Sequence, residues 1–320
     1  DEMVIIGGHR DSWGPGAADN VSGTVSILEA ARAVMEQVKR GERPRRTIVF
    51  ATWDAEEWGL IGSTEYVEDD SLRLMRGGVA YSYQDVGPQG VAFGGGGSPS
   101  LRPTVSDVVK HVNDPSGAGS VYDVWRRRAQ VADTTEPRMG DPGGGSDFAG
   151  FYNHLGIPIA EWGFGGGGGV YHSLYDSFHW MSKFGDPTFA YHAAAARIGA
   201  ALVLRMANAD ILPYDYVEYA RTMRGYVPQV EKAVKEKGWT VDVTALGAAI
   251  DRMERAAAAF AATRDSVLAR GDPPRGVAVR TNAALMRVER ALTRPAGLRT
   301  RPWFRNLIYA ADEDNGYANM

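Results

Sequence analysis

The chain has 320 residues and a mass of 34.6 kDa, which suggests two domains or one large α/β domain with an appendage. A hydrophobic content of 44% with 23% charged residues excludes a disordered or fibrous chain, and the formal net charge of −4 argues against a nucleic-acid partner. Because the sequence contains no cysteine, disulfides, zinc–thiolate sites and thiol nucleophiles are excluded, and any metal must be bound by His, Asp and Glu.

The first part of the chain alternates strand-like and helical patterns. The run 3–8 is Met-Val-Ile-Ile-Gly-Gly, which is typical of a strand buried on both faces, and 21–40 carries apolar residues at helical spacing. We expect further strands at 47–53, 78–83 and 156–161, and a further helix at 60–67. This alternation predicts an α/β fold with a mixed, largely parallel sheet and helices on both faces.

Three glycine runs interrupt this part of the chain, at 94–97, 143–145 and 165–169. Glycine permits backbone conformations that other residues avoid. The runs therefore indicate either flexible surface loops or places where the backbone closely approaches a ligand.

After about residue 210 the sequence changes to long helical patterns, at 214–237, 246–260 and 277–292. In the middle pattern, Leu246, Ile250, Met253 and Phe260 form an apolar stripe at helical spacing. This stripe is covered either within the chain or by a second copy of it.

Polar residues of metal-binding type follow the predicted strands. They are His9, Asp19, the pair Glu56-Glu57, Asp85 and, far downstream, His172. Taken singly, a histidine is more often structural, and a glutamate pair is more often a solvated surface. Together, however, these residues fall where the carboxyl ends of strands in an open α/β sheet meet, which is where such sheets bind ligands. Oxygen and imidazole donors at that edge predict a hydrolytic zinc site.

Four ordered motifs give the chain a family resemblance. They are Gly-Gly-His-Arg-Asp-Ser-Trp at 7–13, the run 45–66 with Thr-Trp-Asp-Ala-Glu-Glu-Trp-Gly-Leu at 52–60, Tyr-His-Ser-Leu-Tyr-Asp at 171–176, and Arg-Pro-Trp-Phe-Arg-Asn-Leu-Ile-Tyr at 301–309. The sequence resembles the glutamate carboxypeptidase II and transferrin receptor group of two-zinc peptidases. The resemblance implies a zinc peptidase domain at 1–210, a helical dimerisation domain at 211–300 and a segment at 301–320 that returns to the peptidase domain.

The same resemblance implies an exopeptidase with two zinc ions per chain. Asp19 would bridge the two ions, with His9 and Asp85 completing one site and Glu57 and His172 completing the other. Tyr83 stands two residues before Asp85, where the family usually has asparagine.

Three further features follow from the resemblance. Glu56 would be the general base that takes a proton from the water between the metals and passes it to the leaving amine. Asp11 would orient the imidazole of His9. The bond between Asp19 and Asn20 is commonly cis in this family.

Two assignments keep an alternative. Tyr309 either polarises the scissile carbonyl or is a core aromatic residue near the C-terminus. Glu65 and Glu68 match two positions of a structural calcium site, but they would also be ordinary residues on an exposed helix face.

The substrate is constrained by an absence in the sequence. Glutamate-specific members hold the terminal carboxylate with arginines shortly before the Tyr-His motif, whereas no Lys or Arg occurs here between Arg138 and Lys183. We therefore expect a pocket for small or apolar side chains, lined by Trp162, Phe164 and Tyr171.

Two other functions remain open at this point. One is a catalytically inactive receptor or scaffold of the transferrin receptor type, and the other is a deacylase of N-acyl amino acids. The expected partners are a peptide substrate, a second copy in a homodimer, and an upstream segment or separate chain packed against 3–8 that completes the peptidase domain. An extracytoplasmic location is favoured by the resemblance alone.

Overall fold

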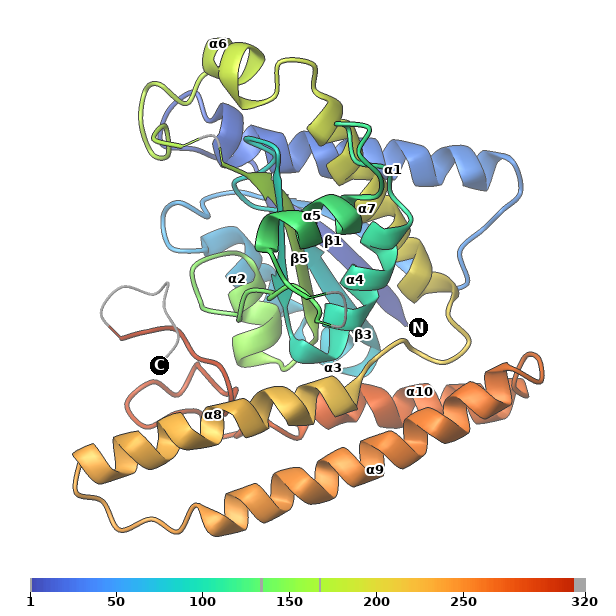
Figure 1. Cartoon of the computed structure of the whole chain (residues 1–320), viewed down its shortest axis with the longest axis vertical. Helices are drawn as coiled ribbons and strands as arrows, with labels where there is room; N and C mark the ends of the chain where they lie inside the picture. Colours follow the sequence, from blue (N-terminus) through green and yellow to red (C-terminus); the bar gives the residue numbers. More distant parts are fainter. Residues whose placement is uncertain (1, 133–134, 167, 314–320) are drawn as a thin grey trace.

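The computed structural model describes residues 2–132, 135–166 and 168–313, and its first two thirds form the α/β domain (Figure 1). The strands are β1 (Met3–His9), β2 (Thr47–Trp53), β3 (Gly78–Tyr83), β4 (Ala92–Gly97) and β5 (Ile159–Gly165). The helices of this domain are α1 (Gly23–Lys39), α2 (Ile61–Asp69), α3 (Ser71–Gly77), α4 (Arg102–Lys110), α5 (Val121–Ala129), α6 (Phe178–Trp180) and α7 (Ala190–Asn208). Shorter helical turns lie at η1 (Ala17–Ser22), η2 (Pro99–Leu101), η3 (Gly150–His154) and η4 (Met181–Gly185).

The five strands form one mixed sheet in the order β2-β1-β3-β5-β4. The pairs β1–β2, β1–β3 and β3–β5 are parallel, and β4 is antiparallel to β5. The predicted mixed, largely parallel sheet is therefore confirmed. Because the parallel strands all point the same way, their carboxyl ends bring His9, Trp53 and Tyr83 to one edge of the sheet.

Two of the glycine runs contribute to strands. Gly94–Gly97 belongs to β4 and pairs with Ala160–Gly163 of β5, and Gly165 ends β5, so at these positions the interpretation as flexible loops was wrong. Glycine has no side chain with which to show the alternation of a strand, and the pattern was therefore not visible in the sequence.

Two hydrophobic cores fill the two faces of the sheet. On one face, Val4 and Ile6 of β1 pack with residues of α1, α4, α5 and α7. On the other face, Met3 and Ile5 pack with residues of α2, α3 and η3. Every residue of β1 is buried, as the apolar run at 3–8 predicted.

The strand β1 is already paired on both sides, with β2 and β3. Its faces are covered by the two cores, so the described residues leave no free edge or face at 3–8. The expectation of a further segment or separate chain packed against this strand is therefore not supported.

The helical module consists of α8 (Tyr216–Glu236), α9 (Thr244–Leu268) and α10 (Arg275–Arg290), which run alongside the α/β domain (Figure 1). In the predicted stripe, Ile250 is 4% exposed and packs in the core of its own chain, whereas Leu246 is 43% exposed. Met253 and Phe260 are partly buried against the same core. The stripe is therefore only partly covered within the chain.

The segment after α10 returns to the α/β domain. The backbone amides of Arg305 and Asn306 both donate to the carbonyl oxygen of Asn153 in η3, and the Asn153 side chain donates to the carbonyl oxygen of Tyr309.

Within the described part of the chain, no helix has the length and hydropathy needed to cross a membrane.

Candidate metal centre

The five predicted metal ligands converge at the carboxyl edge of the sheet. His9 is the last residue of β1, Glu57 follows β2 by four residues and Asp85 follows β3 by two. Asp19 lies in η1, and His172 lies in the loop after β5. Segments up to 163 residues apart in the chain thus supply one site.

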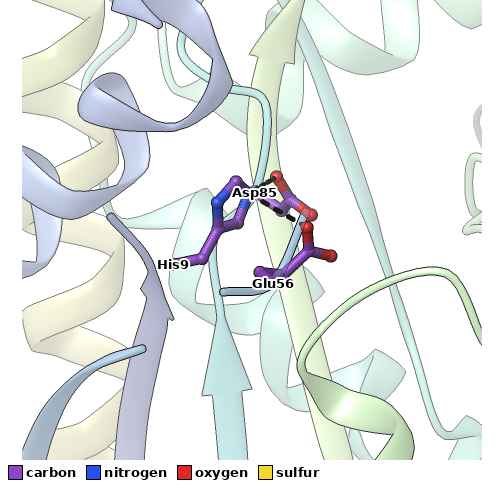
Figure 2. Close-up of side chains that lie close together, drawn as sticks. All are labelled: His9, Glu56 and Asp85. Atoms are coloured by element: carbon purple, nitrogen blue, oxygen red, sulfur yellow. Dashed lines mark hydrogen bonds and ion pairs between the residues drawn. The ribbon is translucent and has the colours of Figure 1, made fainter. Parts of the chain in front are cut away.

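The first group of donors surrounds His9 (Figure 2). Its Nε2 atom lies 3.0 Å from Oδ1 of Asp85, 3.2 Å from Oδ1 of Asp19 and 3.9 Å from Oε2 of Glu56. The Nδ1 atom lies 3.1 Å from the backbone oxygen of Asp11, which favours a proton on Nδ1 and turns Nε2 toward the carboxylates, where it can bind a cation.

The second group surrounds His172. Its Nε2 atom lies 3.0 Å from Oδ2 of Asp19 and 3.1 Å from Oε2 of Glu57. The two oxygens of Asp19 therefore face different histidines, Oδ1 toward His9 and Oδ2 toward His172. This is the arrangement expected of a carboxylate that bridges two cations.

The chemistry of these donors fits zinc. Two sets of three donors each place their ligand atoms within 4.8 Å of one another, namely His9, Glu56 and Asp85, and His9, Asp19 and Glu57. The Oε1 atom of Glu57 is buried without a hydrogen-bond partner in the structure. Buried imidazole nitrogens and carboxylate oxygens in this number are typical zinc ligands, and a bound cation would satisfy the orphaned oxygen.

Asp11 supports the site mainly through the turn that carries the two glutamates. Its Oδ1 and Oδ2 atoms accept the backbone amides of Glu56 and Glu57 at 3.1 and 3.2 Å. Its Oδ1 atom also lies 3.5 Å from Nδ1 of His9, close to the predicted contact. The same turn holds Ala55 in the left-handed region at a φ of 56°, an uncommon conformation for a residue with a Cβ.

Three residues that hold the ligands in place have no role predicted from the sequence. The Asp176 carboxylate accepts the backbone amides of Ala18 and Asp19 at 2.7 and 2.9 Å, and the Ser146 hydroxyl donates to Oδ2 of Asp85 at 2.7 Å. Asn20 donates to the carbonyl oxygen of His9 at 3.2 Å, and the bond between Asp19 and Asn20 is cis, as the resemblance implied. Asp176 is the last residue of the motif at 171–176, and its place in that motif could have indicated a role at the site.

The electrostatics of the centre are those of carboxylates crowded in a buried site. Burial and the neighbouring Asp85 carboxylate raise the pKa of Glu56 to about 9. Burial alone would lower the pKa of His9, but hydrogen bonds with Asp19 and Asp85 outweigh it and raise the pKa to about 12. The cluster therefore retains protons in the absence of a cation, and a bound cation would replace them.

Exposed aromatic side chains flank the second group of donors. Trp13 is 50% exposed and lies against Trp58, with ring centroids 5.0 Å apart, and it meets His172 edge-on at 6.4 Å. The ring of Tyr171 stacks on His172 at 3.7 Å. Tyr171 therefore lies beside the metal centre, and its role in a substrate pocket stays a prediction.

The other two residues of the predicted substrate pocket are in the core. Trp162 and Phe164 are each 1% exposed and project from β5 toward α7, where the Trp162 indole donates to the carbonyl oxygen of Ala195. Their assignment to the pocket was wrong because alternate residues of β5 face opposite sides of the sheet.

Tyr309 is also buried, with 3% of its surface exposed. Its hydroxyl lies 2.8 Å from the Tyr226 hydroxyl and 3.5 Å from Oδ1 of Asp141, and its ring packs in the core beside η3. The structure does not bring Tyr309 together with the metal ligands, and it favours the alternative of a core aromatic residue.

Glu65 and Glu68 are exposed on α2, and Glu68 accepts a hydrogen bond from the Trp303 indole at 2.6 Å. In the described residues, neither belongs to a group of three or more donors suited to a metal. Calcium binding therefore stays a prediction.

Comparison with known families adds to this geometry. Residues 1–196 match Peptidase family M28, and residues 241–320 match the Transferrin receptor-like dimerisation domain. The chain belongs to peptidase family M28. The M28 match contains all five metal ligands and Glu56, and the two matches together confirm the family resemblance drawn from the motifs.

Relatives of this M28 chain carry two kinds of name. Probable glutamate carboxypeptidase LAMP1 from Arabidopsis thaliana is 38% identical over 321 residues, which cover 100% of this chain and 45% of that protein. Aminopeptidase NAALADL1 from Rattus norvegicus is 32% identical over 326 residues, which cover 97% and 44%. The chain thus spans less than half the length of these relatives.

A solved structure, the aminopeptidase from Aneurinibacillus sp. strain AM-1, is 24% identical to this chain. The match covers 63% of this chain and 43% of that one, with a TM-score of 0.46. At this level of similarity it adds nothing to the assignment of function.

Proposed function

We propose that the chain carries the catalytic centre of a zinc-dependent exopeptidase that hydrolyses peptide bonds. The observation that carries the proposal is the position of Asp19, whose two carboxylate oxygens face His9 and His172 at 3.2 and 3.0 Å. Membership in peptidase family M28 and the convergence of all five donors support it.

The chain offers a ligand set for each of two zinc ions. Asp19, His9 and Asp85 would hold one ion, and Asp19, Glu57 and His172 would hold the other. Bound zinc at this site would supply Lewis-acid polarisation of the scissile carbonyl and make water acidic enough to attack at neutral pH.

Glu56 is the general base in this proposal. Its carboxylate lies 3.9 Å from Nε2 of His9 in the same buried site, and a metal ion bound there would keep it ionised, so that it can accept a proton from the attacking water. The same carboxyl group then passes the proton to the leaving amine. Asp11 fixes the position of both glutamates through their backbone amides, so that Glu56 and Glu57 keep separate roles.

The two competing functions are distinguished by different observations. A receptor or scaffold with a degenerate centre would not need the full set of donors, and all five ligands and Glu56 are present here. A deacylase of N-acyl amino acids would use the same centre on a different acyl group, so substrates must separate it from a peptidase.

We also propose that the chain acts as a homodimer. The match of residues 241–320 to a dimerisation domain supports this, as does an open apolar groove of about 480 Å³ between α9 and α10. Met253, Ala257, Phe260 and Val288 line the groove.

The experiment that tests the proposed activity is hydrolysis of a dipeptide panel, with free and N-acylated amino termini, by the zinc-loaded chain. We expect release of amino acids that is abolished by a chelator and restored by zinc. Turnover of the N-acylated amino acids alone would establish the deacylase instead. Full zinc occupancy without turnover of any substrate would favour the receptor or scaffold.

A further inference from the structure

Glu161 is a carboxylate beside the metal centre that the proposed mechanism does not use. Glu161 is in β5, between the buried residues Ala160 and Trp162, so its side chain projects to the opposite face of the sheet. In the parallel ladder, Glu161 is the partner of Tyr83, which stands two residues before the metal ligand Asp85. Glu161 thus lies one strand away from the centre.

On the side of Glu161 away from Tyr83, four positions of the sheet have no side chain. Gly94, Gly96, Gly163 and Gly165 of the antiparallel pair β4–β5 occupy the same face as Glu161, and we call them the glycine face. No atom lies within 4 Å of the place that a Cβ would take at three of them, Gly94, Gly163 and Gly165. A Cβ on Gly96 would lie 2.7 Å from Oε2 of Glu161, so the carboxylate lies directly over Gly96.

The charge of Glu161 has no cationic partner in the described part of the chain. The Tyr83 hydroxyl is its hydrogen-bond partner, and the sequence has no Lys or Arg between Arg138 and Lys183. Burial raises the pKa of this carboxyl group, as expected where the charged form lacks a counterion. A cationic ligand group would favour the charged form.

The glycine face lies next to the metal centre. Glu161 pairs with Tyr83, two residues before the ligand Asp85, and the Asp85 carboxylate is close enough to contribute to the raised pKa of Glu161. The loop that begins at Asp85 folds back onto β5, where the backbone amide of Gln89 donates to the carbonyl oxygen of Phe164 at 2.8 Å. Because the backbone at Gly163 and Gly165 is open, a side chain of a peptide bound at the centre could reach Glu161 across it.

We propose that Glu161 and the glycine face form the subsite for a basic side chain of the peptide, that of a lysine or arginine adjacent to the scissile bond. This inference rests on the proposed peptidase function. The long aliphatic stem of such a side chain fits a flat surface without side chains. Its terminal cation donates a charge-assisted hydrogen bond to the Glu161 carboxylate. An acidic substrate side chain would meet a like charge there.

The kinetic test compares dipeptides that carry lysine, norleucine or glutamate on either side of the scissile bond. Norleucine keeps the stem of lysine and removes the charge. At one of the two positions we expect kcat/KM for lysine to exceed that for norleucine by at least about tenfold, with glutamate slowest. Glu161→Gln should reduce the lysine preference to below about twofold.

The matched control is Glu136→Gln, which removes the charge of an exposed carboxylate outside the site and should keep the preference. A second variant, Gly163→Lys, places a cation in the open space beside Glu161 and should also abolish the preference. Zinc content and thermal melting are measured for each variant. Unchanged selectivity in folded, zinc-replete Glu161→Gln and Gly163→Lys would overturn the inference and leave Glu161 a structural partner of Tyr83.

A binding measurement separates this inference from the proposed function. Three zinc-loaded proteins are used: the single variant Glu56→Gln and the two double variants in which it is combined with Glu161→Gln or with Glu136→Gln. Each protein is titrated calorimetrically with Lys-Lys and with norleucyl-norleucine. We expect tighter binding of Lys-Lys that depends on Glu161 and not on Glu136. That result without turnover in the wild-type chain would refute the peptidase and retain the subsite. Turnover without a Glu161-dependent preference would do the reverse.

Discussion

Glu56 and Glu57 are consecutive residues that the structure places in different surroundings. The Glu57 carboxylate contacts His172 at 3.1 Å, whereas the Glu56 carboxylate lies 3.9 Å from Nε2 of His9. Asp11 accepts both of their backbone amides, which orients the turn between the two groups of donors. Replacing one carboxylate oxygen by an amide nitrogen should therefore impair catalysis at Glu56 and metal binding at Glu57.

We expect Glu56→Gln to keep zinc and to lose turnover by roughly 10² to 10⁴, the usual contribution of general acid–base catalysis. The amide keeps the shape of the side chain but cannot accept the proton. Metal analysis beside steady-state kinetics checks this, with the exposed substitution Glu136→Gln as control. If turnover of Glu56→Gln stayed near that of the control, Glu56 would not be the base.

The metal ligands themselves were predictable from residue type and position, because imidazole and carboxylate groups follow successive strands. The residues that hold them in place were not. Ser146 acts through one hydrogen bond to Asp85, and Asp176 acts through hydrogen bonds to the amides of Ala18 and Asp19. No periodicity or spacing marks such contacts. Glu161 is marked in the structure by strand register, which places Trp162 in the core and Glu161 on the other face.

At the scale of elements, apolar patterning was sufficient for the strands near the centre. The strands predicted at 47–53 and 78–83 have those bounds, and the run at 3–8 extends to His9. The strand predicted at 156–161 is shifted to Ile159–Gly165, and β4 was not predicted. Both errors fall where glycines replace the side chains that reveal a strand.

The contact between α10 and η2 carries a pH-dependent prediction. Glu289 of α10 is 1% exposed and accepts a hydrogen bond from the Ser100 hydroxyl, and burial raises its pKa to about 8. The folded chain therefore binds a proton here that the unfolded chain releases near pH 4.5. Between these two values, the free energy of unfolding should fall as pH rises, by up to about 1.4 kcal/mol per pH unit from this group.

Glu289→Gln should remove that contribution, because the amide does not titrate. Denaturant unfolding of the wild-type chain and of Glu289→Gln at several pH values from 5 to 9 measures the difference between them. A difference in unfolding free energy that does not change with pH would show that Glu289 is not held protonated in the folded chain.

At the scale of the whole molecule, the two domains meet along a covered interface, while the helical module keeps an open apolar groove between α9 and α10. Exposed apolar grooves of this kind are unfavourable in water unless a partner covers them. The stripe read from the sequence explains the core contacts of α9, but the groove depends on α10 as well. The position of the groove could therefore not be predicted from the stripe alone.

We expect the wild-type chain to form a dimer and Ala256→Glu to form a monomer. Ala256 lines the groove and is exposed, so the glutamate should block the partner without disturbing the core. Ala259→Glu is the control, since Ala259 is exposed on the same helix and is not among the groove residues. Light scattering gives the mass, and equal masses for the two variants would exclude the groove as the dimer interface.

The central claim is that Asp19 bridges two metal ions, and the stoichiometry of bound zinc tests it most directly. After dialysis against buffered zinc, elemental analysis should give two ions for each wild-type chain and about one for Glu57→Gln and for Asp85→Asn, since each of these removes a ligand of a single ion. Asp19→Asn should retain almost none, because both ions share that carboxylate. A wild-type chain that binds one ion, or an Asp19→Asn chain that keeps as much zinc as the other two variants, would contradict the account.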